Sequence, residues 1–371
     1  MSEAPRVSEI EPGADPRWDE FVAGHPDGHV YLHSAWLRCL VAEYPRPLIG
    51  LCTENPDGRL TGILPLVATR GMPLLRRNAA VGARLSSLPR TPLAGPLALD
   101  RAATAALLEA AVERAKSRSA ARLQVKRAAP DLDGLVPEIG GAPWRVSYVL
   151  ALPDDEAALR FGNSRNHGRI KWAVNKASKE GVRVRVADDL ADVHAWYPLY
   201  LKTMREVVVP PRPLRLFEAM WQELAPEGLM RLYVAEQEGS GMIAGSIVLG
   251  LGRTAFYAFN GRLRSALALR PNEVLQWEAI HDSCRRGFER YDLGEVTAGH
   301  AGLAEFKRKW GADEVQLHRY YHPPPPPPGA EADAEEAEGE GGVVKRAAAS
   351  LWPRLPVAAT RLAGDVAYRW L

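Results

Sequence analysis

Cysteine is scarce in this sequence, and long apolar runs are absent. The chain has 3 cysteines in 371 residues, Cys39, Cys52 and Cys284. Because these cysteines are few, odd in number and widely spaced, they exclude a disulfide framework and fit a reducing cytoplasm. No window approaches about 18 consecutive apolar residues, which excludes a membrane-spanning helix. The amino-terminal segment Met1–Arg17 is polar, so we expect no secretory signal.

A strong net charge is also absent. The 47 Lys and Arg residues nearly balance 45 Asp and Glu residues, leaving a formal net charge of +2. A charge of this size would not draw the whole molecule to DNA or to a membrane. The hydrophobic content of 46% and the charged content of 25% are those of a soluble globular protein. A chain of this length exceeds one typical core, so we expect two domains.

Several catalytic motifs are missing. No G-x-S-x-G elbow and no C-x-x-C pair occurs. His25, His29 and His33 recur every four residues, but Pro26, Asp27 and Gly28 break any helix between the first two. We interpret these histidines as loop and core residues and expect no metal site.

The two halves of the chain show the same order of elements. The first half predicts a hairpin, a helix and two further strands, at 47–54, 60–69, 102–118, 122–126 and 145–152. The second half predicts a meander of three strands at 231–237, 242–249 and 254–259, followed by a helix that begins at Asn272. A strand at 290–296, a short helix at 303–310 and a final strand at 314–322 complete it. A helical region over 155–179 separates the halves. This repetition indicates a duplication.

The composition changes abruptly after His322. Pro323–Pro328 is a polyproline run, which predicts a stiff spacer. Glu331–Gly342 is acidic and has no aromatic residue, so we expect it to be disordered. The tail from Ser350 is amphipathic if helical, with an apolar side made of Leu355, Ala359, Leu362, Val366 and Trp370. Because the spacer separates it from the folded body, we expect this basic helix to bind an anionic membrane surface; docking on its own protein or on a partner is the alternative.

Several segments together resemble the Fem-type (FemABX-like) branch of the GNAT superfamily. They are His29–Leu40 (HVYLHSAWLRCL), Gly62–Leu66 (GILPL), Leu85–Pro89, Gly95–Leu97, Arg165–Gly181, Pro271–Trp277, Tyr291–Gly294 and Phe306–Gly311. The resemblance covers roughly residues 15 to 322. The resemblance implies a mixed α/β fold with mainly antiparallel sheets, built as two tandem GNAT-like domains over 1–152 and 153–322. A disordered linker over 323–342 and a carboxy-terminal amphipathic helix in the tail 343–371 complete the expected organisation.

The resemblance implies an acyltransferase, whose donor would be acyl-CoA or aminoacyl-tRNA. No Gln/Arg-x-x-Gly-x-Gly/Ala loop for the pyrophosphate of CoA occurs, and the long helical arm of some tRNA-using members is also missing. The sequence therefore does not choose between the two donors, and tRNA is a candidate partner. We expect no permanently bound cofactor.

The resemblance also places two catalytic candidates. Lys307 matches the position at which a fixed cation would stabilise the charge that develops on the acyl carbonyl oxygen; a solvated basic turn with Arg308 and Lys309 is the alternative. Asp292 falls in a strand that should be buried, so it must be paired, hydrogen-bonded or facing a cleft. It could accept a proton, orient Lys307 or simply fix the strand to a loop.

Two basic segments are candidates for binding substrate phosphates. Arg270 and Asn272 stand at a helix start, where free N–H groups attract anions, although Asn272 also suits an N-cap. Tyr257, on the strand before them, is a weaker candidate or a core aromatic. In a helix from Ser164, one face would carry Arg165, Arg169, Trp172, Lys176 and Lys179. This face could hold phosphates and stack on a base, or be an ordinary solvated surface.

These observations predict an N-acyltransferase of cytoplasmic location, peripheral at the inner membrane face. Its acceptor would be an amine on a phosphate-bearing cell-envelope or polysaccharide precursor, either a small molecule or lipid-linked. A tRNA-dependent aminoacyltransferase of peptidoglycan bridges is one alternative. A non-catalytic scaffold for glycan assembly at the membrane is the other.

Overall fold

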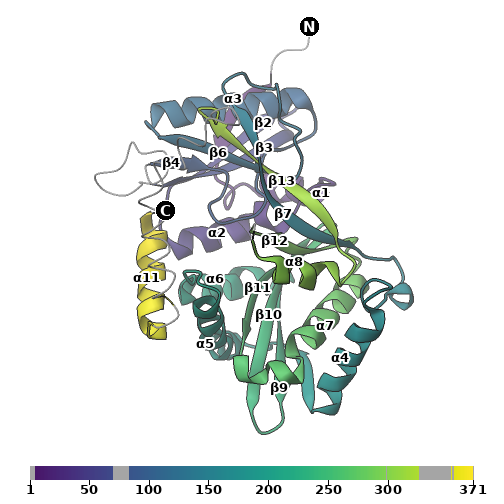
Figure 1. Ribbon diagram of the computed structural model, residues 1–371. Coiled ribbons are helices and arrows are strands. Elements are labelled where there is room, and N and C mark those ends of the chain that lie inside the picture. The colour runs from purple at the N-terminus through teal and green to yellow at the C-terminus, as the bar shows by residue number, and fades with distance from the viewer. Residues whose placement is uncertain (1–4, 70–82, 298, 326–351, 353–354, 371) are drawn as a thin grey trace.

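The structure is a computed structural model that describes residues 5–69, 83–297, 299–325, 352 and 355–370. Within these residues, thirteen strands form one sheet that runs through both halves of the molecule (Figure 1). The strands are β1 Arg6–Ile10, β2 Leu48–Glu54, β3 Leu60–Thr69, β4 Arg84–Ser86, β5 Leu97–Ala98, β6 Arg122–Arg127, β7 Gly140–Ala151, β8 Val182–Val186, β9 Met230–Gln237, β10 Gly241–Leu251, β11 Thr254–Arg262, β12 Arg290–Val296 and β13 Asp313–His322.

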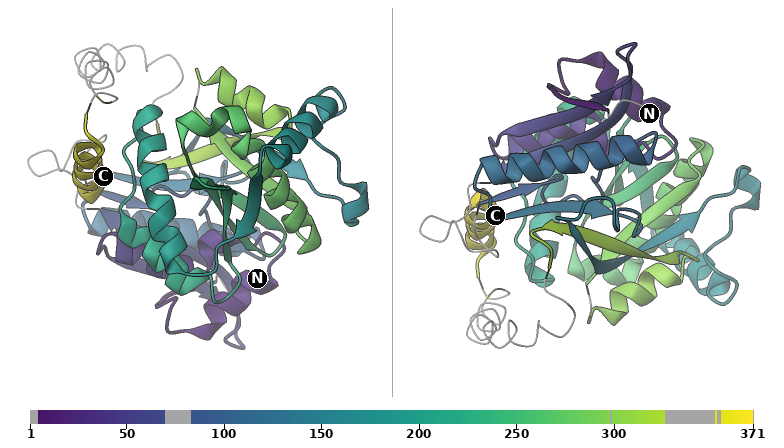
Figure 2. Two further views of the ribbon diagram at one scale, coloured as in Figure 1. Left: turned by 90° about the horizontal axis from the view of Figure 1, so that it is seen from below. Right: turned by 90° about the horizontal axis from the view of Figure 1, so that it is seen from above.

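Helices pack on both faces of this sheet (Figure 2). The α-helices are α1 Pro16–Gly24, α2 Ser34–Glu43, α3 Arg101–Ser117, α4 His167–Lys179, α5 Leu190–Glu206, α6 Leu214–Leu224, α7 Pro271–Arg285, α8 Ala301–Arg308 and α11 Val357–Trp370. Three 3-10 turns are η1 Val30–Leu32, η2 Glu156–Ala158 and η3 Arg264–Leu269. Among the described residues, no helix is both long and apolar enough to cross a membrane. Cys39, Cys52 and Cys284 are buried free thiols.

The same series of elements occurs twice along the chain. The first half runs β1, α1, α2, β2, β3, β4, α3 and β6, with the short β5 added beside β3. The second half runs β8, α5, α6, β9, β10, β11, α7 and β12. In each half the last two strands of this series pair in parallel, β4 with β6 and β11 with β12. The other described pairs are antiparallel. The predicted mixed α/β fold with mainly antiparallel pairing is therefore confirmed.

Two strands join the halves into one sheet. β13, the last strand, lies between β6 of the first half and β7, and β7 also pairs with β12 of the second half. The largest core cluster also contains side chains of both halves, among them Trp18 and Trp36 together with Trp196 and Phe217. The halves therefore share both a sheet and a core, and a domain boundary at residue 152 stays a prediction.

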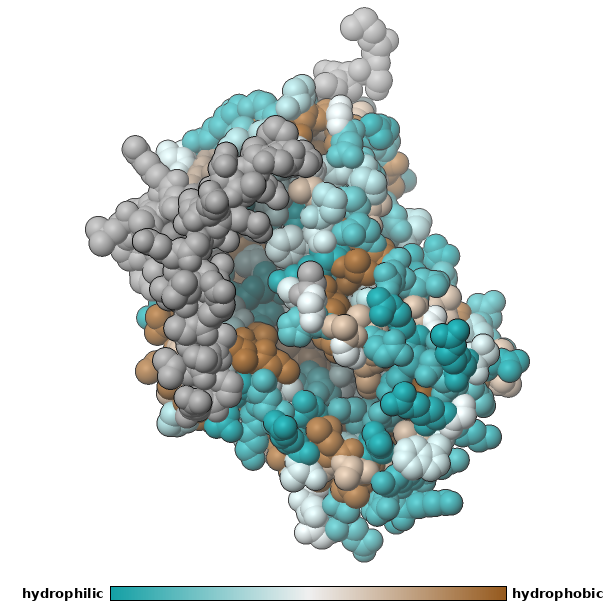
Figure 3. Space-filling view, viewed as in Figure 1, coloured by the Kyte–Doolittle hydropathy of each residue, from teal (hydrophilic) through white to brown (hydrophobic). Residues whose placement is uncertain are grey.

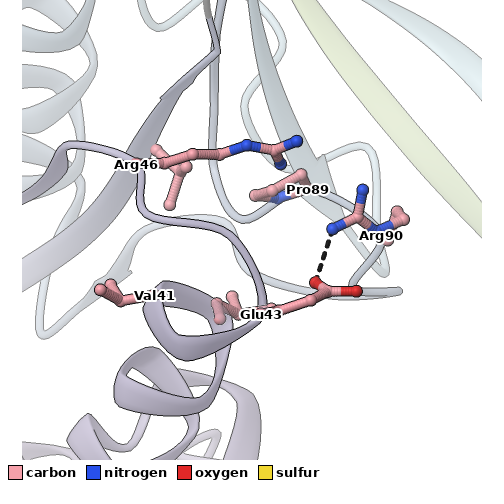
Figure 4. A pocket seen from close by; sticks show the side chains of 7 residues that line it. Val41, Glu43, Arg46, Pro89 and Arg90 are labelled. Atoms are coloured by element: carbon pink, nitrogen blue, oxygen red, sulfur yellow. Dashed lines mark hydrogen bonds and ion pairs between the residues drawn. The ribbon is translucent and has the colours of Figure 1, made fainter. Parts of the chain in front are cut away.

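A buried ion pair crosses between the halves. Glu43, at the end of α2, is fully buried and accepts hydrogen bonds from Arg212 at 2.8 and 2.6 Å, where Arg212 lies just before α6. Arg90, in the segment after β4, donates to the same carboxylate at 2.6 Å (Figure 4). Burial by itself raises the pKa of Glu43, but the two arginines outweigh it and the pKa falls to about 2.

The helix before β8 begins later than the sequence analysis predicted. The first part of the expected helical region, residues 155–166, is a 3-10 turn followed by a loop, and α4 starts at His167 instead of Ser164. The reason is tertiary: Asn163 donates from its backbone to the Lys309 carbonyl at 3.1 Å and from its amide to the Arg308 carbonyl at 3.1 Å. These bonds hold the segment against the end of α8, so it cannot continue the helix.

The expectation that the tail helix stands apart from the body is wrong. α11 lies against α5 (Figure 1). Thr360 and Gly364 are buried, and Asp365 accepts hydrogen bonds from Tyr44 at 2.9 Å and Arg215 at 2.8 Å. Tyr368 donates to the Pro210 carbonyl at 2.8 Å. The small residues of this helix allow a close approach to the body that its apolar pattern does not reveal. The predicted linker from residue 326, with the first part of the tail, lies outside the described residues.

The Glu43 cluster gives a stability prediction. Glu43→Gln leaves Arg90 and Arg212 buried without their counter-charge, so the free energy of unfolding at neutral pH should decrease by about 3 kcal/mol. Because the folded pKa of about 2 lies below the ordinary 4.5, the carboxylate stabilises the fold above pH 4.5 and this contribution is lost as pH falls toward 2. Denaturant unfolding at a series of pH values measures both effects. Equal stability of the variant and the wild type at neutral pH would contradict the interpretation.

Candidate active site

The site lies where β11 and β12 separate. These strands pair in parallel only from Thr254–Phe256 to Arg290–Asp292. Beyond these residues β11 remains paired with β10, whereas β12 remains paired with β7. Gly294, in β12, has a positive φ of 85°, a conformation that glycine adopts without strain. The backbone of β12 therefore leaves β11 here, and its next carbonyl groups lose a partner strand.

Lys307 occupies the place where the strands part. α8 carries this side chain, which is only 5% exposed, and its Nζ donates to the carbonyls of Gly294 at 2.8 Å and Glu295 at 3.2 Å. A Cβ added to Gly294 would lie 3.6 Å from this Nζ and 3.7 Å from the Tyr257 carbonyl of β11. The ammonium group thus lies at the gap between the two strands. The alternative of a solvated basic turn is wrong for Lys307, although Arg308 beside it is exposed.

Burial brings the pKa of Lys307 closer to neutral pH. Desolvation lowers its pKa to about 8, against the opposing effects of the Asp292 and Glu295 carboxylates. An ammonium group has three N–H donors, and two of them bind the β12 carbonyls. No other hydrogen bond of Lys307 occurs among the described residues, which leaves the third donor for a ligand in the gap.

Asp292 fixes the turn that holds Lys307. Its Oδ1 accepts hydrogen bonds from the Ser147 hydroxyl and from the Gly294 N–H, both at 2.7 Å. Asp292 is 5% exposed, and burial raises its pKa. Among the described residues it makes no direct hydrogen bond to Lys307. Its effect on the lysine passes through the Gly294 backbone and through its charge.

A cationic rim surrounds the start of α7 next to this gap. Arg270 has a left-handed backbone with φ 61° immediately before Pro271, the first residue of α7. Lys309, two residues after Lys307, binds Glu273 in the first turn of α7 at 3.1 Å. Burial lowers the pKa of Lys309, and the nearby charges of Arg169 and Arg270 lower it further. Three cations therefore meet one carboxylate at a helix N-terminus, which favours anions.

Asn272 is not the N-cap that the sequence suggested. It is the second residue of α7, because Pro271 supplies the first. Its Oδ1 is buried and has no hydrogen-bond partner among the described residues. A carbonyl oxygen in this position needs a donor, and a bound ligand could supply one.

Trp172 connects α4 to the rim. Its ring is 53% exposed, with the Arg270 guanidinium 5.5 Å and the Lys176 Nζ 5.7 Å from the ring centroid. The structure thus brings Arg169, Trp172, Lys176, Arg270 and Asn272 to one region. Arg165 lies outside the helix face predicted for it: it is exposed in the turn before α4, and no described hydrogen bond or ion pair joins it to the others.

Tyr257 borders the gap through its backbone. Its side chain packs against the second core cluster, and burial raises its pKa to about 12. The interpretation as a core aromatic fits these contacts better than a hydroxyl directed at a substrate. Figure 3 shows the molecular face hollowed near its centre, between the side of α6 and the side of α8.

The sequence analysis missed the buried charges behind the gap. Arg319, on β13, is 3% exposed, donates to the Pro92 carbonyl at 3.0 Å and lies 3.6 Å from Glu295. Arg145 binds the same glutamate at 2.7 Å. The alternating pattern of β13 indicated the burial of Arg319, because Arg319 shares a strand face with the buried Leu317. These side chains tie β12 beside Lys307 to the first half.

The corresponding place in the first half is filled by the chain itself. After β4 and β6 pair, Ser87 continues along β6 with an N–H bond of 2.8 Å to the Gln124 carbonyl. The buried Lys126 donates to the carbonyls of Leu88 and, at 3.0 Å, Thr91. Leu88 and Arg90 have left-handed φ values of 59° and 53°, which a leucine or arginine adopts only when the surroundings hold it. Residues 87–91 therefore close the gap in this half.

Comparisons with known proteins support one family. Residues 163–308 match the family described as Acetyltransferase (GNAT) domain. FemX has a similar structure, with a TM-score of 0.64 and 15% identity over 85% of this chain and 96% of that chain. L-PGS from Bacillus licheniformis has a TM-score of 0.57 and 11% identity over 86% and 94% of the two chains.

A third similar structure is a carboxy-terminal DUF2156 domain from Agrobacterium fabrum. Its TM-score is 0.54, with 11% identity over 82% of this chain and 90% of that chain. Among curated proteins, no sequence matches this one. Residues 163–308 are thus similar to the GNAT acetyltransferase domain, and the chain shares the overall fold of FemX.

Proposed function

We propose that this protein is an N-acyltransferase that moves an acyl or aminoacyl group to an amine of a phosphate-bearing cell-envelope or polysaccharide precursor. The observation that carries the proposal is Lys307, which is buried at the opening between β11 and β12 and binds two β12 carbonyls, with no third acceptor among the described residues. A fixed cation in a dry site is suited to a carbonyl oxygen that gains negative charge.

The reaction follows from this placement. The amine nitrogen attacks the acyl carbonyl carbon, a C–N bond forms, and the carbonyl oxygen takes the negative charge beside Lys307. Collapse of this intermediate breaks the C–S bond of a thioester or the C–O bond of an aminoacyl ester. The proton lost by the amine is balanced by the proton gained by the thiolate or alkoxide that leaves. Asp292 acts as a positioning residue, because it holds the Gly294 turn on which Lys307 rests.

The cationic rim supports a phosphate-bearing donor. Acyl-CoA and aminoacyl-tRNA both carry phosphates, and both have a base that could stack on Trp172. Arg169, Arg270 and Lys309 supply the charge, and the first turn of α7 supplies backbone N–H groups. The rim fits either donor.

The acceptor class is supported by a similar protein. The Agrobacterium fabrum protein carries the provisional name lysylphosphatidylglycerol synthetase, which points to a phospholipid product there. For the present chain we propose the broader class of phosphate-bearing precursors, soluble or lipid-linked.

The direct test replaces Lys307. Protein is incubated with radiolabelled acetyl-CoA or radiolabelled aminoacyl-tRNA and a fractionated extract of nucleotide-linked and lipid-linked precursors. Label that survives hydroxylamine measures amide formation, because esters and thioesters are cleaved. Lys307→Ala should lose about a hundredfold or more in rate, since it removes an oxyanion donor.

The matched control is Lys116→Ala, which removes an exposed lysine from α3 in the first half. It should keep the wild-type rate. Amide formation by Lys307→Ala at the wild-type rate would reject the catalytic role, and no transfer by the wild type with either donor would reject the proposed function.

The pH dependence distinguishes two roles of Lys307. Its folded pKa of about 8 means that the ammonium form predominates below pH 8 and is lost above it. If the ammonium stabilises the oxyanion, the ratio of wild-type to Lys307→Ala rates should be constant below pH 8 and fall as pH rises through 8. Taking the ratio removes the titration of the acceptor amine. A ratio that rises through pH 8 would instead identify neutral Lys307 as a base.

Charge reversal tests the rim. Arg169→Glu combined with Lys176→Glu should weaken donor binding about tenfold or more at low salt, and the difference should shrink as salt screens the charges. Arg101→Glu combined with Arg118→Glu, two exposed arginines at the ends of α3, changes the net charge equally and should leave binding unchanged. Calorimetric titration with CoA and with uncharged tRNA measures both. Equal affinities of the two double variants would show that the α4 face is only a solvated surface.

A further inference from the structure

α11 keeps an apolar surface after it has docked. Leu362 is 66% exposed and Val366 is 56% exposed, one helical turn apart on the side turned away from α5. The buried side of the helix is a different one, made by Thr360 and Gly364, and a Cβ on Gly364 would lie 2.5 Å from the Pro211 carbonyl. Small residues therefore make the closest contacts of α11, Val357 packs against the core, and Leu362 and Val366 stay outside.

A second apolar element lies beside this helix. Val207, Val208 and Val209, which follow α5, are all exposed. α11 runs along the same segment, because Arg205 donates to the Leu355 carbonyl at 3.3 Å and Tyr368 to the Pro210 carbonyl at 2.8 Å. We term the exposed apolar side chains of these two neighbouring elements, three valines and the Leu362 and Val366 pair, the α11 face.

The valine loop is built to present its side chains. Val208 has a φ of 57°, a strained conformation for a β-branched residue. The N–H groups of Val207, Val208 and Val209 bind the carbonyls of Thr203, Arg205 and Met204 at 3.0, 3.4 and 3.0 Å. Their backbone donors are therefore satisfied within the loop, which lowers the cost of moving it into an apolar medium.

The exposed charges of α11 have one sign. Among the described residues of α11, the exposed charged side chains are Arg361 and Arg369. The acid Asp365 is half-buried and pairs with Arg215 at 2.8 Å and with Arg369 at 4.0 Å. Figure 2 shows α11 at the edge of the described part of the molecule in both views.

We propose that the α11 face binds the surface of an anionic lipid bilayer, with Leu362, Val366 and the valine loop in the interface and Arg361 and Arg369 at the lipid phosphates. Apolar side chains flanked by arginines fit the boundary between headgroups and acyl chains. The helix binds as a docked part of the folded body, so it fixes the orientation of the whole protein on the membrane. This inference does not depend on the chemistry proposed for Lys307.

The test uses the full chain and sedimentation with vesicles of phosphatidylcholine, with or without phosphatidylglycerol. The wild type should bind the anionic vesicles, and less at high salt. Leu362→Glu combined with Val366→Glu should lower the partition coefficient about tenfold or more, because both side chains point away from the body and the fold is not perturbed. Val208→Asp tests the valine loop independently and should act in the same direction.

Two controls separate this surface from other causes of binding. Leu99→Glu changes a leucine that is 63% exposed in the first half, and it should bind as the wild type does. Lys307→Ala should also bind normally, which excludes lipid capture by the candidate active site.

Three results would overturn the inference. The wild type does not bind anionic vesicles, the Leu362→Glu and Val366→Glu variant binds as well as the wild type, or the α11 face joins two copies of the chain. Sedimentation equilibrium detects the last case as a dimer that the double variant abolishes.

Discussion

The parallel pairing of β11 with β12, and its end after Phe256 and Asp292, is the constraint on which the site depends. Where the strands separate, Gly294 and Glu295 are no longer paired with β11, and buried carbonyls need donors. Lys307 supplies these donors, which compensates part of the cost of burying its charge. Within the described residues, these bonds leave one Lys307 donor without an acceptor, beside the place where the strands separate. Lys307 therefore both binds buried backbone carbonyls and has the role that we propose in the reaction.

Duplication gives the chain two versions of this junction with different outcomes. In the first half residues 87–91 continue beside β6, and Lys126 binds their carbonyls instead of a ligand. In the second half a lysine also binds backbone carbonyls, but it lies at an opening. Glu43, Arg90 and Arg212 then connect the two halves, so the closed junction supports the open one. Only the second-half junction offers a site in the described part of the chain.

The sequence predicted the elements that carry a clear pattern. The strands at 60–69 and 290–296 were placed to the residue, because alternation and turn signals bound them. α5 and α6 were missed; α5 contains Pro198, which argues locally against a helix that tertiary packing nevertheless forms. The start of α4 was misplaced because Asn163 is held by α8, a contact that no local pattern reveals.

The site was predictable to a lesser degree. Resemblance selected Lys307 and Asp292, and the strand pattern indicated that Asp292 is buried. The burial of Lys307 follows from β12 leaving β11, which requires the assembled sheet. Residue periodicity placed Trp172 and Lys176 together on α4, as the structure does, whereas Arg165 lies in the turn before that helix. The tail shows the same limit: its pattern predicted the helix but not its docking, because Thr360 and Gly364 pack through small size and not through hydrophobicity.

The central claim is that the acyl group reacts beside Lys307, in the gap between β11 and β12. A crystal structure with an unreactive thioether analogue of acyl-CoA, or with an amide analogue of the aminoacyl-tRNA end, measures this most directly. The account predicts the acyl carbonyl oxygen within hydrogen-bond distance of the Lys307 Nζ, with donor phosphates at the start of α7. A donor bound elsewhere, or a carbonyl oxygen out of reach of Lys307, would contradict it.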